Sequence, residues 1–293
     1  MTLRKQIQTI LPAPVDLAQK SLRTAIHRLG LWGGLFRDCR GVSPVDQVVL
    51  VRSFRASLAG LTDAPGQWRE PQLVEHATLV VTDGFRFTIR ARSDDLGHIR
   101  QRTHQRLIDP LLGHLPPGGT AIDAGANIGI FTANFSRAVG PTGRVIAVEM
   151  MPETAISLRQ TIALNDLGNV ELVEMALSDE AGKVLDIGMP DASHFGQASI
   201  IRNLDGRGRS ISVMATTLDD VTKGLERIHI MKMDLEGAEL LALRGARRTL
   251  QITDAILYEV AEDDAEIDRI FSNNGYRIRR IDGLNKLAER VRR

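Results

Sequence analysis

Residues 120–132, TAIDAGANIGIFT, decide the fold of this chain. An apolar run ends in the carboxylate Asp123, and a turn with Gly125 and Gly129 leads into a segment with helical spacing. Glycine permits a sharp turn and leaves room for a ligand to approach the backbone. The N–H groups at the start of the helix would face the same space. The stretch therefore predicts a strand, a turn and a helix that form a cofactor site.

The glycine spacing separates two classes of cofactor. Dinucleotide-binding turns follow the pattern G-x-G-x-x-G and place a pyrophosphate on the helix N-terminus, whereas this chain has G-x-x-x-G. The charge of Asp123 would repel a pyrophosphate but suits the amine and sulfonium of S-adenosylmethionine. The pattern favours S-adenosylmethionine, and an NAD-dependent oxidoreductase is the less favoured alternative.

Composition and charge exclude several classes of protein. The chain has 293 residues, 43% of them apolar, enough for one large domain with an extension. It has a single cysteine, a net charge of +1 and 4% aromatic residues. We therefore expect no disulfide, no metal site and no nucleic-acid partner. The absence of a signal peptide and of a long apolar run predicts a cytoplasmic protein.

Residues 1–115 are expected to form an N-terminal extension that ends in a lead-in helix. Residues 15–31 place apolar and basic side chains on opposite faces of a predicted amphipathic helix. We expect this helix to pack on its own domain or on a sister subunit of a homo-oligomer, and contact with an anionic membrane is the less favoured alternative. Residues 61–72 are typical of a linker, and residues 77–89 predict a β-hairpin.

Residues 116–293 are expected to form an α/β domain with a doubly wound, mostly parallel sheet, because strand-like and helical segments alternate. The predicted strands are 120–123, 144–149, 170–175, 229–234 and 254–260, and the predicted helices are 129–139, 153–166, 237–250 and 263–273. Residues 182–217 interrupt this alternation with polar sequence between two short strand-like runs. Such an insertion at the ligand edge is expected to shape the substrate pocket.

Carboxylates recur at the ends of four predicted strands. Ligands of doubly wound sheets lie beyond the carboxyl ends of the strands. Asp123 ends the first strand, and Glu149 ends the second, 24 residues past Gly125, where it suits the two hydroxyls of a ribose. Asp234 and Glu259 end the fourth and fifth strands. The third strand ends near Ala176 and Leu177, which are small and apolar enough to hold an adenine ring.

Four segments resemble the FkbM family of S-adenosylmethionine-dependent methyltransferases. They are residues 121–129, 148–153, 165–179 and 231–239, the last of which reads MKMDLEGAE and is followed by Gly245–Ala246. The resemblance covers about residues 115–282. It implies a seven-strand, Rossmann-like methyltransferase sheet with an antiparallel strand near 276–281. It also implies O-methylation of a hydroxyl on a sugar, a glycan or a secondary metabolite.

The resemblance implies a set of cofactor contacts by position. The set for the methionine part is Asp123, Ala124, Gly125, Ala126, Asn127 and Gly129; Glu149 would hold the ribose, and Met150, Ala176 and Leu177 would flank the adenine. Asp234 would face the methionine amine or the acceptor. Many relatives carry an aromatic residue and a glutamate where this chain has residues 102–105, so the resemblance does not predict the pocket entrance.

The expected reaction is an in-line attack of a hydroxyl oxygen on the sulfonium methyl, with no metal and with a base that takes the hydroxyl proton. The candidate bases are Asp234, Glu236, Glu259 and His194. Asp234 and Glu259 are preferred because they end central strands. Glu236 would equally suit a helix-capping role, and His194 lies in the inserted segment. The alternative function is a non-catalytic binding or scaffold protein that retains this fold.

Overall fold

The computed structural model describes residues 13–60, 70–99, 101–188, 210–259 and 264–291. Of residues 13–21, 101–105 and 264 it describes the backbone alone. The candidate base His194 therefore lies outside the described residues.

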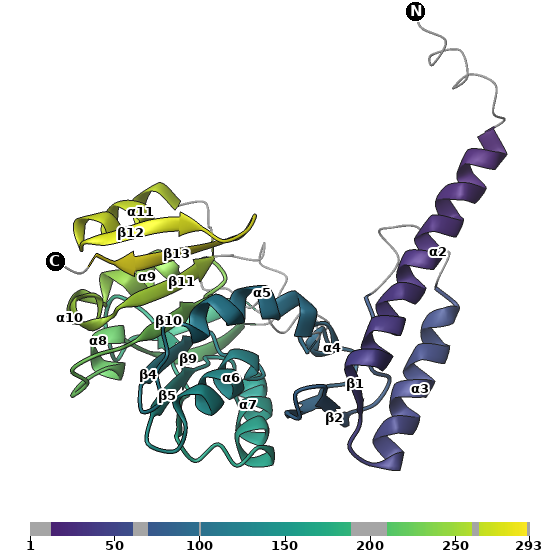
Figure 1. Ribbon diagram of the computed structural model, residues 1–293, viewed down its shortest axis with the longest axis horizontal. Helices are drawn as coiled ribbons and strands as arrows, with labels where there is room; N and C mark the ends of the chain where they lie inside the picture. Colours follow the sequence, from purple (N-terminus) through teal and green to yellow (C-terminus); the bar gives the residue numbers. More distant parts are fainter. Residues whose placement is uncertain (1–12, 61–69, 100, 189–209, 260–263, 292–293) are drawn as a thin grey trace, which may run out of the picture.

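A seven-stranded sheet forms the centre of the larger part of the molecule (Figure 1). Its strand order is β12-β13-β11-β10-β4-β5-β6. The strands are β4 (Thr120–Ala124), β5 (Arg144–Val148), β6 (Val170–Val173), β10 (Ile230–Met233), β11 (Ala255–Glu259), β12 (Tyr276–Arg280) and β13 (Asn285–Arg290). Strands β6, β5, β4, β10 and β11 are parallel, which confirms the five predicted strands and the doubly wound α/β fold.

The reversed strand of the sheet is β13 rather than the segment near 276–281. Strand β13 is antiparallel both to β11 and to β12, so β12 runs in the same direction as the parallel strands. The strand expected near 276–281 is present as β12, but the expectation that it is the antiparallel strand of the sheet is wrong, because the reversal lies in β13. The sequence of β13, NKLAER, has no strand-like alternation, yet Leu287 and Ala288 are fully buried there. Burial at this place in the sheet overrides weak local propensity.

Helices cover both faces of the sheet, and the alternation of side chains along each strand divides the core in two. Ile122, Ile146 and Met231 point to one face, while Ala121, Val145 and Ile230 point to the other. The helices are α5 (Gln101–Leu112), α6 (Ile130–Val139), α7 (Pro152–Leu164), α8 (Leu218–Val221), α9 (Glu239–Arg244), α10 (Arg247–Ile252) and α11 (Asp264–Asn273). The predicted helix 237–250 is thus two helices that meet at Gly245.

The break between α9 and α10 has a packing reason. A Cβ atom on Gly245 would lie 2.4 Å from the carbonyl oxygen of Ser178. The chain therefore approaches the end of the short strand β7 (Ala176–Leu177) closely at this point. Strand β7 belongs to a separate sheet, in the order β7-β9-β8, with β8 (Val184–Gly188) and β9 (Ser210–Thr216). These two are the strand-like runs of the insertion, whereas the third central strand ends at Val173 and does not reach Ala176.

The N-terminal extension consists of helices and a small sheet. Its elements are α2 (Ala13–Asp38), β1 (Cys39–Gly41), α3 (Pro44–Leu58), β2 (Ala77–Val81), β3 (Arg86–Ile89) and α4 (Asp95–His98). The predicted hairpin is confirmed as β2 and β3, and β1 pairs with β2. Helices α2 and α3 lie side by side, and α2 projects beyond the rest of the fold (Figure 1).

Three residues of the apolar face predicted for residues 15–31 do not pack on the extension. Leu22, Ile26 and Leu29 are 61%, 60% and 41% exposed, whereas Trp32 and Leu35 further along α2 fill the core. Packing of this face on its own domain is thus wrong for these three residues, and a sister subunit or a membrane stays a prediction. In the described part of the chain, no helix is both long and apolar enough to cross a bilayer.

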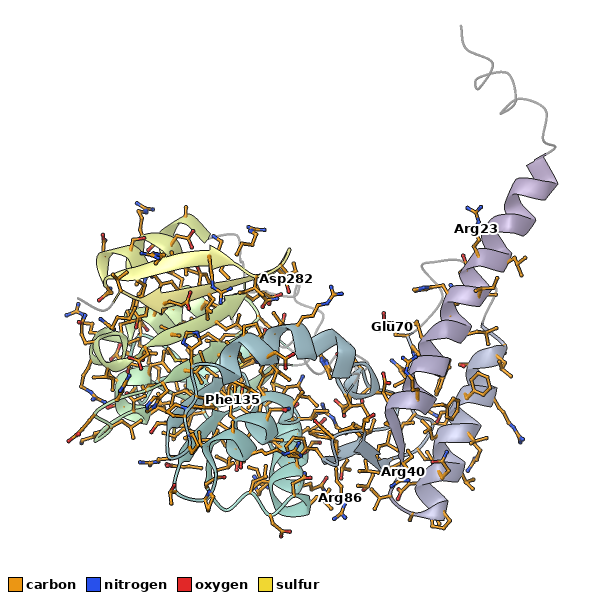
Figure 2. All side chains as sticks on the ribbon, viewed as in Figure 1. Arg23, Arg40, Glu70, Arg86, Phe135 and Asp282 are labelled. Carbon is orange, nitrogen blue, oxygen red and sulfur yellow. The ribbon has the colours of Figure 1, made fainter. Side chains whose placement is uncertain are left out.

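The extension and the α/β domain share contacts across the predicted boundary. Figure 2 shows Arg86 of β3 where the extension meets the domain. The side chain of Asn165, which follows α7, accepts a hydrogen bond from the Arg86 N–H and donates one to its carbonyl, both at 2.8 Å. The core of the extension also includes Ile128 and Leu167 of the domain. Division of the chain at residue 115 remains a prediction, and these contacts hold the extension against α7 and the segments beside it.

Candidate active site

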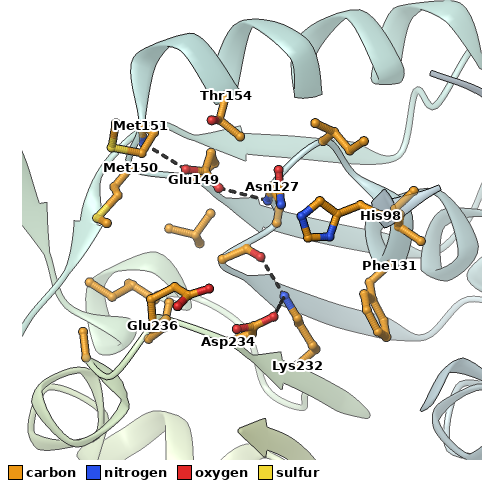
Figure 3. A pocket seen from close by; sticks show the side chains of 18 of the residues that line it. His98, Asn127, Phe131, Glu149, Met150, Met151, Thr154, Lys232, Asp234 and Glu236 are labelled. Carbon is orange, nitrogen blue, oxygen red and sulfur yellow. Dashed lines mark hydrogen bonds and ion pairs between the residues drawn. The ribbon is translucent and has the colours of Figure 1, made fainter. Parts of the chain in front are cut away.

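A cavity of about 910 Å³, counting the space open to solvent at its mouth, lies beyond the carboxyl ends of β4, β5 and β10 (Figure 3). The predicted site residues that line it are Gly125, Ala126, Asn127, Glu149, Met150, Leu177, Asp234 and Glu236. The described site residues that lie outside the lining are Asp123, Ala124, Gly129, Ala176 and Glu259.

The two glycines of the opening turn are needed for contacts within the protein. Gly125 and Gly129 have φ angles of +78° and +94°, which glycine adopts without strain. A Cβ on Gly125 would lie 1.9 Å from the carbonyl oxygen of Asp234, and one on Gly129 would lie 2.7 Å from the Leu158 side chain. From the sequence, we expected the turn to make room for a ligand. Instead, the room beside each glycine is filled by neighbouring parts of the chain, which fixes the turn against the end of β10 at Gly125 and against α7 at Gly129.

Glu149 ties the glycine turn to the end of β5. Its carboxylate accepts hydrogen bonds from the backbone N–H groups of Asn127 and Met151, each at 2.9 Å. Burial raises the pKa of Glu149, although the two N–H groups oppose that shift. A carboxylate has about four lone-pair sites, so two remain for hydroxyl donors. Asn127 has a φ of +49°, and its buried Oδ1 has no hydrogen-bond partner among the described residues.

Lys232 lies in the wall of the cavity and was not predicted from the sequence. Its Nζ donates to the carbonyl of Gly125 at 2.7 Å and lies 3.3 Å from Asp234 Oδ2 and 3.7 Å from Asp123 Oδ1. Burial alone would lower the pKa of Lys232, but the two carboxylates raise it above its ordinary value. The sequence did contain a sign of this role. Lys232 is a charged residue inside an apolar strand, and it lies two positions before Asp234 and therefore on the same face of the sheet.

Asp123 is fully buried beneath the cavity. Its Oδ2 accepts a 2.5 Å hydrogen bond from Thr132, and burial raises its pKa while Lys232 opposes the shift. We expected the negative charge of Asp123 to attract a cationic ligand, but the ammonium of Lys232 lies beside it and compensates that charge. The carboxylate that does face the cavity is Asp234, whose side chain is 45% exposed.

Asp234 and Glu259 form a coupled pair of carboxyl groups. Burial would raise the pKa of Asp234, but the ammonium of Lys232 lowers it below its ordinary value. Burial and the negative charges of Asp234, Glu236 and Glu239 raise the pKa of Glu259 to about 7, with Asp234 as its hydrogen-bond partner. Glu259 lies behind Asp234 rather than in the lining. Because its pKa is about 7, the pair can hold a proton at neutral pH.

Glu236 lines the cavity in an uncommon backbone conformation. Its φ of +53° lies in the left-handed region that side chains other than glycine rarely adopt. The residue before the first turn of α9 is Ala238, so Glu236 stands two residues before the capping position. The backbone N–H of Leu235 is instead bound by Glu239 at 2.7 Å. This arrangement leaves Glu236 directed at the cavity.

His98 of α4 also lines the cavity, although it belongs to the extension. Its Nε2 lies 3.7 Å from Asp94 Oδ2. Burial would lower the pKa of His98, but Asp94, Asp95 and Asp234 raise it. Helix α4 has only four residues, which is too short for hydrophobic periodicity to show from the sequence.

The cavity has an apolar end and a charged end. Figure 3 shows Met150 and Met151 at one end and His98, Lys232 and Phe131 at the other, with Glu149 and Asn127 between them. Met175 and Leu177 extend the apolar lining. The described residues contain no group of His, Cys, Asp or Glu side chains that could hold a metal ion. The layout suits an elongated ligand with an apolar ring, a central diol and an ionised terminus.

Comparison with known proteins gives one family and several distant relatives. The family model for the methyltransferase FkbM domain matches residues 123–278, more than half of the chain. Methyltransferase sdnD of Sordaria araneosa is 26% identical over an alignment of 204 positions that covers 58% of this chain and 78% of that protein. A protein-L-isoaspartate O-methyltransferase of Triticum aestivum is 28% identical over 127 positions, covering 40% of this chain and 55% of its own. A solved SAM-dependent O-methyltransferase of Thermotoga maritima has a TM-score of 0.41 at 12% identity, covering 76% of this chain and 80% of that one.

Proposed function

Because the chain belongs to the FkbM methyltransferase family, its cofactor is S-adenosylmethionine, and we propose that it methylates a hydroxyl oxygen of a sugar, a glycan or a secondary metabolite. When bound, the cofactor supplies a methyl group on a positively charged sulfur. The residues of the cavity would bind it, orient the acceptor and take the acceptor's proton.

The lining fits S-adenosylmethionine along its whole length. Met150 and Leu177 would flank the adenine, and the remaining lone pairs of Glu149 would accept the ribose hydroxyls. The partnerless Oδ1 of Asn127 would accept a hydrogen bond from the methionine ammonium. This assignment satisfies a buried polar atom that the described protein leaves unpaired.

The charge at the polar end also fits. The charged side chains that line the cavity are the carboxylates of Glu149, Asp234 and Glu236 and the cations Lys232 and His98. S-adenosylmethionine carries a sulfonium and an ammonium that these carboxylates would attract. They would repel the pyrophosphate of a dinucleotide.

The observation that carries the choice of oxygen is the Asp234–Glu259 pair. A neutral amine attacks without prior loss of a proton, whereas an alcohol needs a base as the new bond forms. Asp234 faces the cavity, and Glu259 behind it has a pKa of about 7. We propose that the pair, with both carboxylates ionised, takes the hydroxyl proton at Asp234 and that Glu259, the more basic member, then holds it. Glu236 would then position the acceptor.

The test is transfer of a tritiated methyl group from S-adenosylmethionine to a panel of glycosides and macrolide alcohols, with matched amino sugars as the comparison. The proposal predicts labelling of at least one alcohol and loss of labelling in Asp234→Asn. Cofactor binding with no transfer to any member would favour the scaffold alternative. Labelling of the amino sugars alone would overturn the choice of oxygen, and binding of NAD would revive the oxidoreductase alternative.

A further inference from the structure

We infer that His98 of the N-terminal extension binds the carboxylate of the methionine part of the cofactor. The inference rests on the proposed cofactor site. It adds a protein partner for the cofactor's carboxylate, which the preceding assignments leave without one. His98 lies in the lining beside Asn127, at the charged end of the cavity (Figure 3). The extension would therefore complete the cofactor site rather than cover it passively.

Helix α4 is held rigidly enough to place this side chain. Arg90 donates to both carboxylate oxygens of Asp95, at 2.8 and 2.7 Å, and to the hydroxyl of Thr154 at 3.0 Å. Asp95 is fully buried, and Thr154 belongs to α7 of the domain and lines the same cavity. A buried bidentate pair fixes both distance and orientation. The start of α4 is therefore anchored to the wall that His98 faces.

Lys232, the other cation of the lining, already has acceptors around its ammonium. An ammonium has three donors, and three acceptors surround this one: the Gly125 carbonyl and the carboxylates of Asp234 and Asp123. A further carboxylate at Lys232 would have to displace one of them. His98 is the other cationic side chain of the lining, and its pair with Asp94 at 3.7 Å is longer than the 2.7 Å hydrogen bond that holds Lys232.

The surroundings of His98 favour its protonated form. Asp94 and Asp95 of α4 and Asp234 beyond β10 face it, while Lys232 lies across the same cavity. The three carboxylates raise the pKa of His98 against the effect of burial. Affinity for the cofactor carboxylate is therefore expected to fall as the pH rises through this pKa, because the neutral imidazole loses its charge.

The test compares two probes that differ by one group. S-adenosylmethionine and decarboxylated S-adenosylmethionine are titrated calorimetrically into the full chain and into His98→Gln. A lost charge-assisted hydrogen bond predicts that the substitution weakens S-adenosylmethionine binding by about ten- to a hundredfold and leaves the decarboxylated probe within about twofold. His114→Gln is the matched control, since His114 pairs with Glu289 at 3.2 Å and does not line the cavity. It should change neither affinity.

A second variant tests the charge of His98 without removing the ring. Asp94→Asn is expected to lower the pKa of His98, measured by NMR of labelled histidine, and to weaken S-adenosylmethionine binding more at about pH 7.5 than at about pH 6. Equal weakening of both probes by His98→Gln, or no weakening, overturns the assignment while the cofactor site stands. Failure of the wild-type chain to bind S-adenosylmethionine would instead overturn the proposed function.

Discussion

Glu149 accepts a 2.9 Å hydrogen bond from the backbone N–H of Asn127, so the end of β5 holds the turn that follows β4 in place. The same carboxylate binds the Met151 N–H at 2.9 Å. One side chain thus orders two loops that line the cavity, and it faces the position we assign to the ribose. The Glu149 carboxylate therefore both holds the two loops in place and belongs to the proposed cofactor site.

Glu149→Gln is expected to weaken binding of S-adenosylhomocysteine by about a hundredfold, which exceeds the effect of one lost neutral hydrogen bond. The amide would place an N–H₂ donor against a backbone N–H donor in addition to losing a ribose acceptor. Calorimetric titration measures the affinity, and circular dichroism checks the fold. Unchanged affinity in a folded variant would remove Glu149 from the cofactor site.

Gly125→Ala should disrupt the turn through a clash rather than through backbone strain. The new Cβ would meet the Asp234 carbonyl at 1.9 Å, so we expect a lower melting temperature and loss of measurable S-adenosylhomocysteine binding. Gly140→Ala separates the two causes. Gly140 also has a positive φ, +66°, but a Cβ added there would meet no atom of the described residues within 4 Å beyond its immediate chain neighbours. Similar losses in both variants would contradict the clash.

Asp95→Ala is expected to destabilise the fold by about 3 to 5 kcal/mol, because it leaves the guanidinium of Arg90 buried without its counter-charge. Urea unfolding measures the change. Glu75→Ala is the control, since the Arg52–Glu75 pair at 2.8 Å is about half exposed on both sides. The control should stay within about 1 kcal/mol of wild type. Equal effects of the two substitutions would show that the Arg90–Asp95 pair does not anchor α4.

Glu259→Gln should stabilise the protein at about pH 8 and change little at about pH 5. The pKa of Glu259 in the fold is about 7, above its ordinary value, so the folded state retains a proton that the unfolded chain releases. Between these two pKa values, stability falls as the pH rises. The amide resembles the protonated carboxyl and removes this loss. Melting temperatures across this pH range test it, and parallel curves for both proteins would refute the raised pKa.

The residues that end predicted strands were the part of the site that the sequence could predict. Asp123, Glu149 and Asp234 each end or follow an apolar run that local sequence patterns identify as a strand. Because these strands are parallel, their carboxyl ends, and with them the three carboxylates, lie at one edge of the sheet. The glycine spacing and the charge of Asp123 favoured S-adenosylmethionine, and the family resemblance narrowed this to the FkbM methyltransferases. Neither source separated Asp123, which is buried against Lys232, from Asp234, which faces the cavity.

The remaining features depend on contacts between distant segments. His98 reaches the cavity because β3 and α4 dock on α7 through Arg90, and no local pattern encodes that contact. Strand β13 forms because it inserts between β11 and β12. Such tertiary effects override local propensity, which is why the sequence alone did not predict these elements.

The most direct test of the central claim is a crystal structure of the chain with S-adenosylhomocysteine. The proposed site predicts the adenine between Met150 and Leu177, the ribose hydroxyls on Glu149 and the amino-acid part between Asn127 and His98. Density for the ligand outside this cavity, or with its adenine at the charged end beside Lys232, would contradict it.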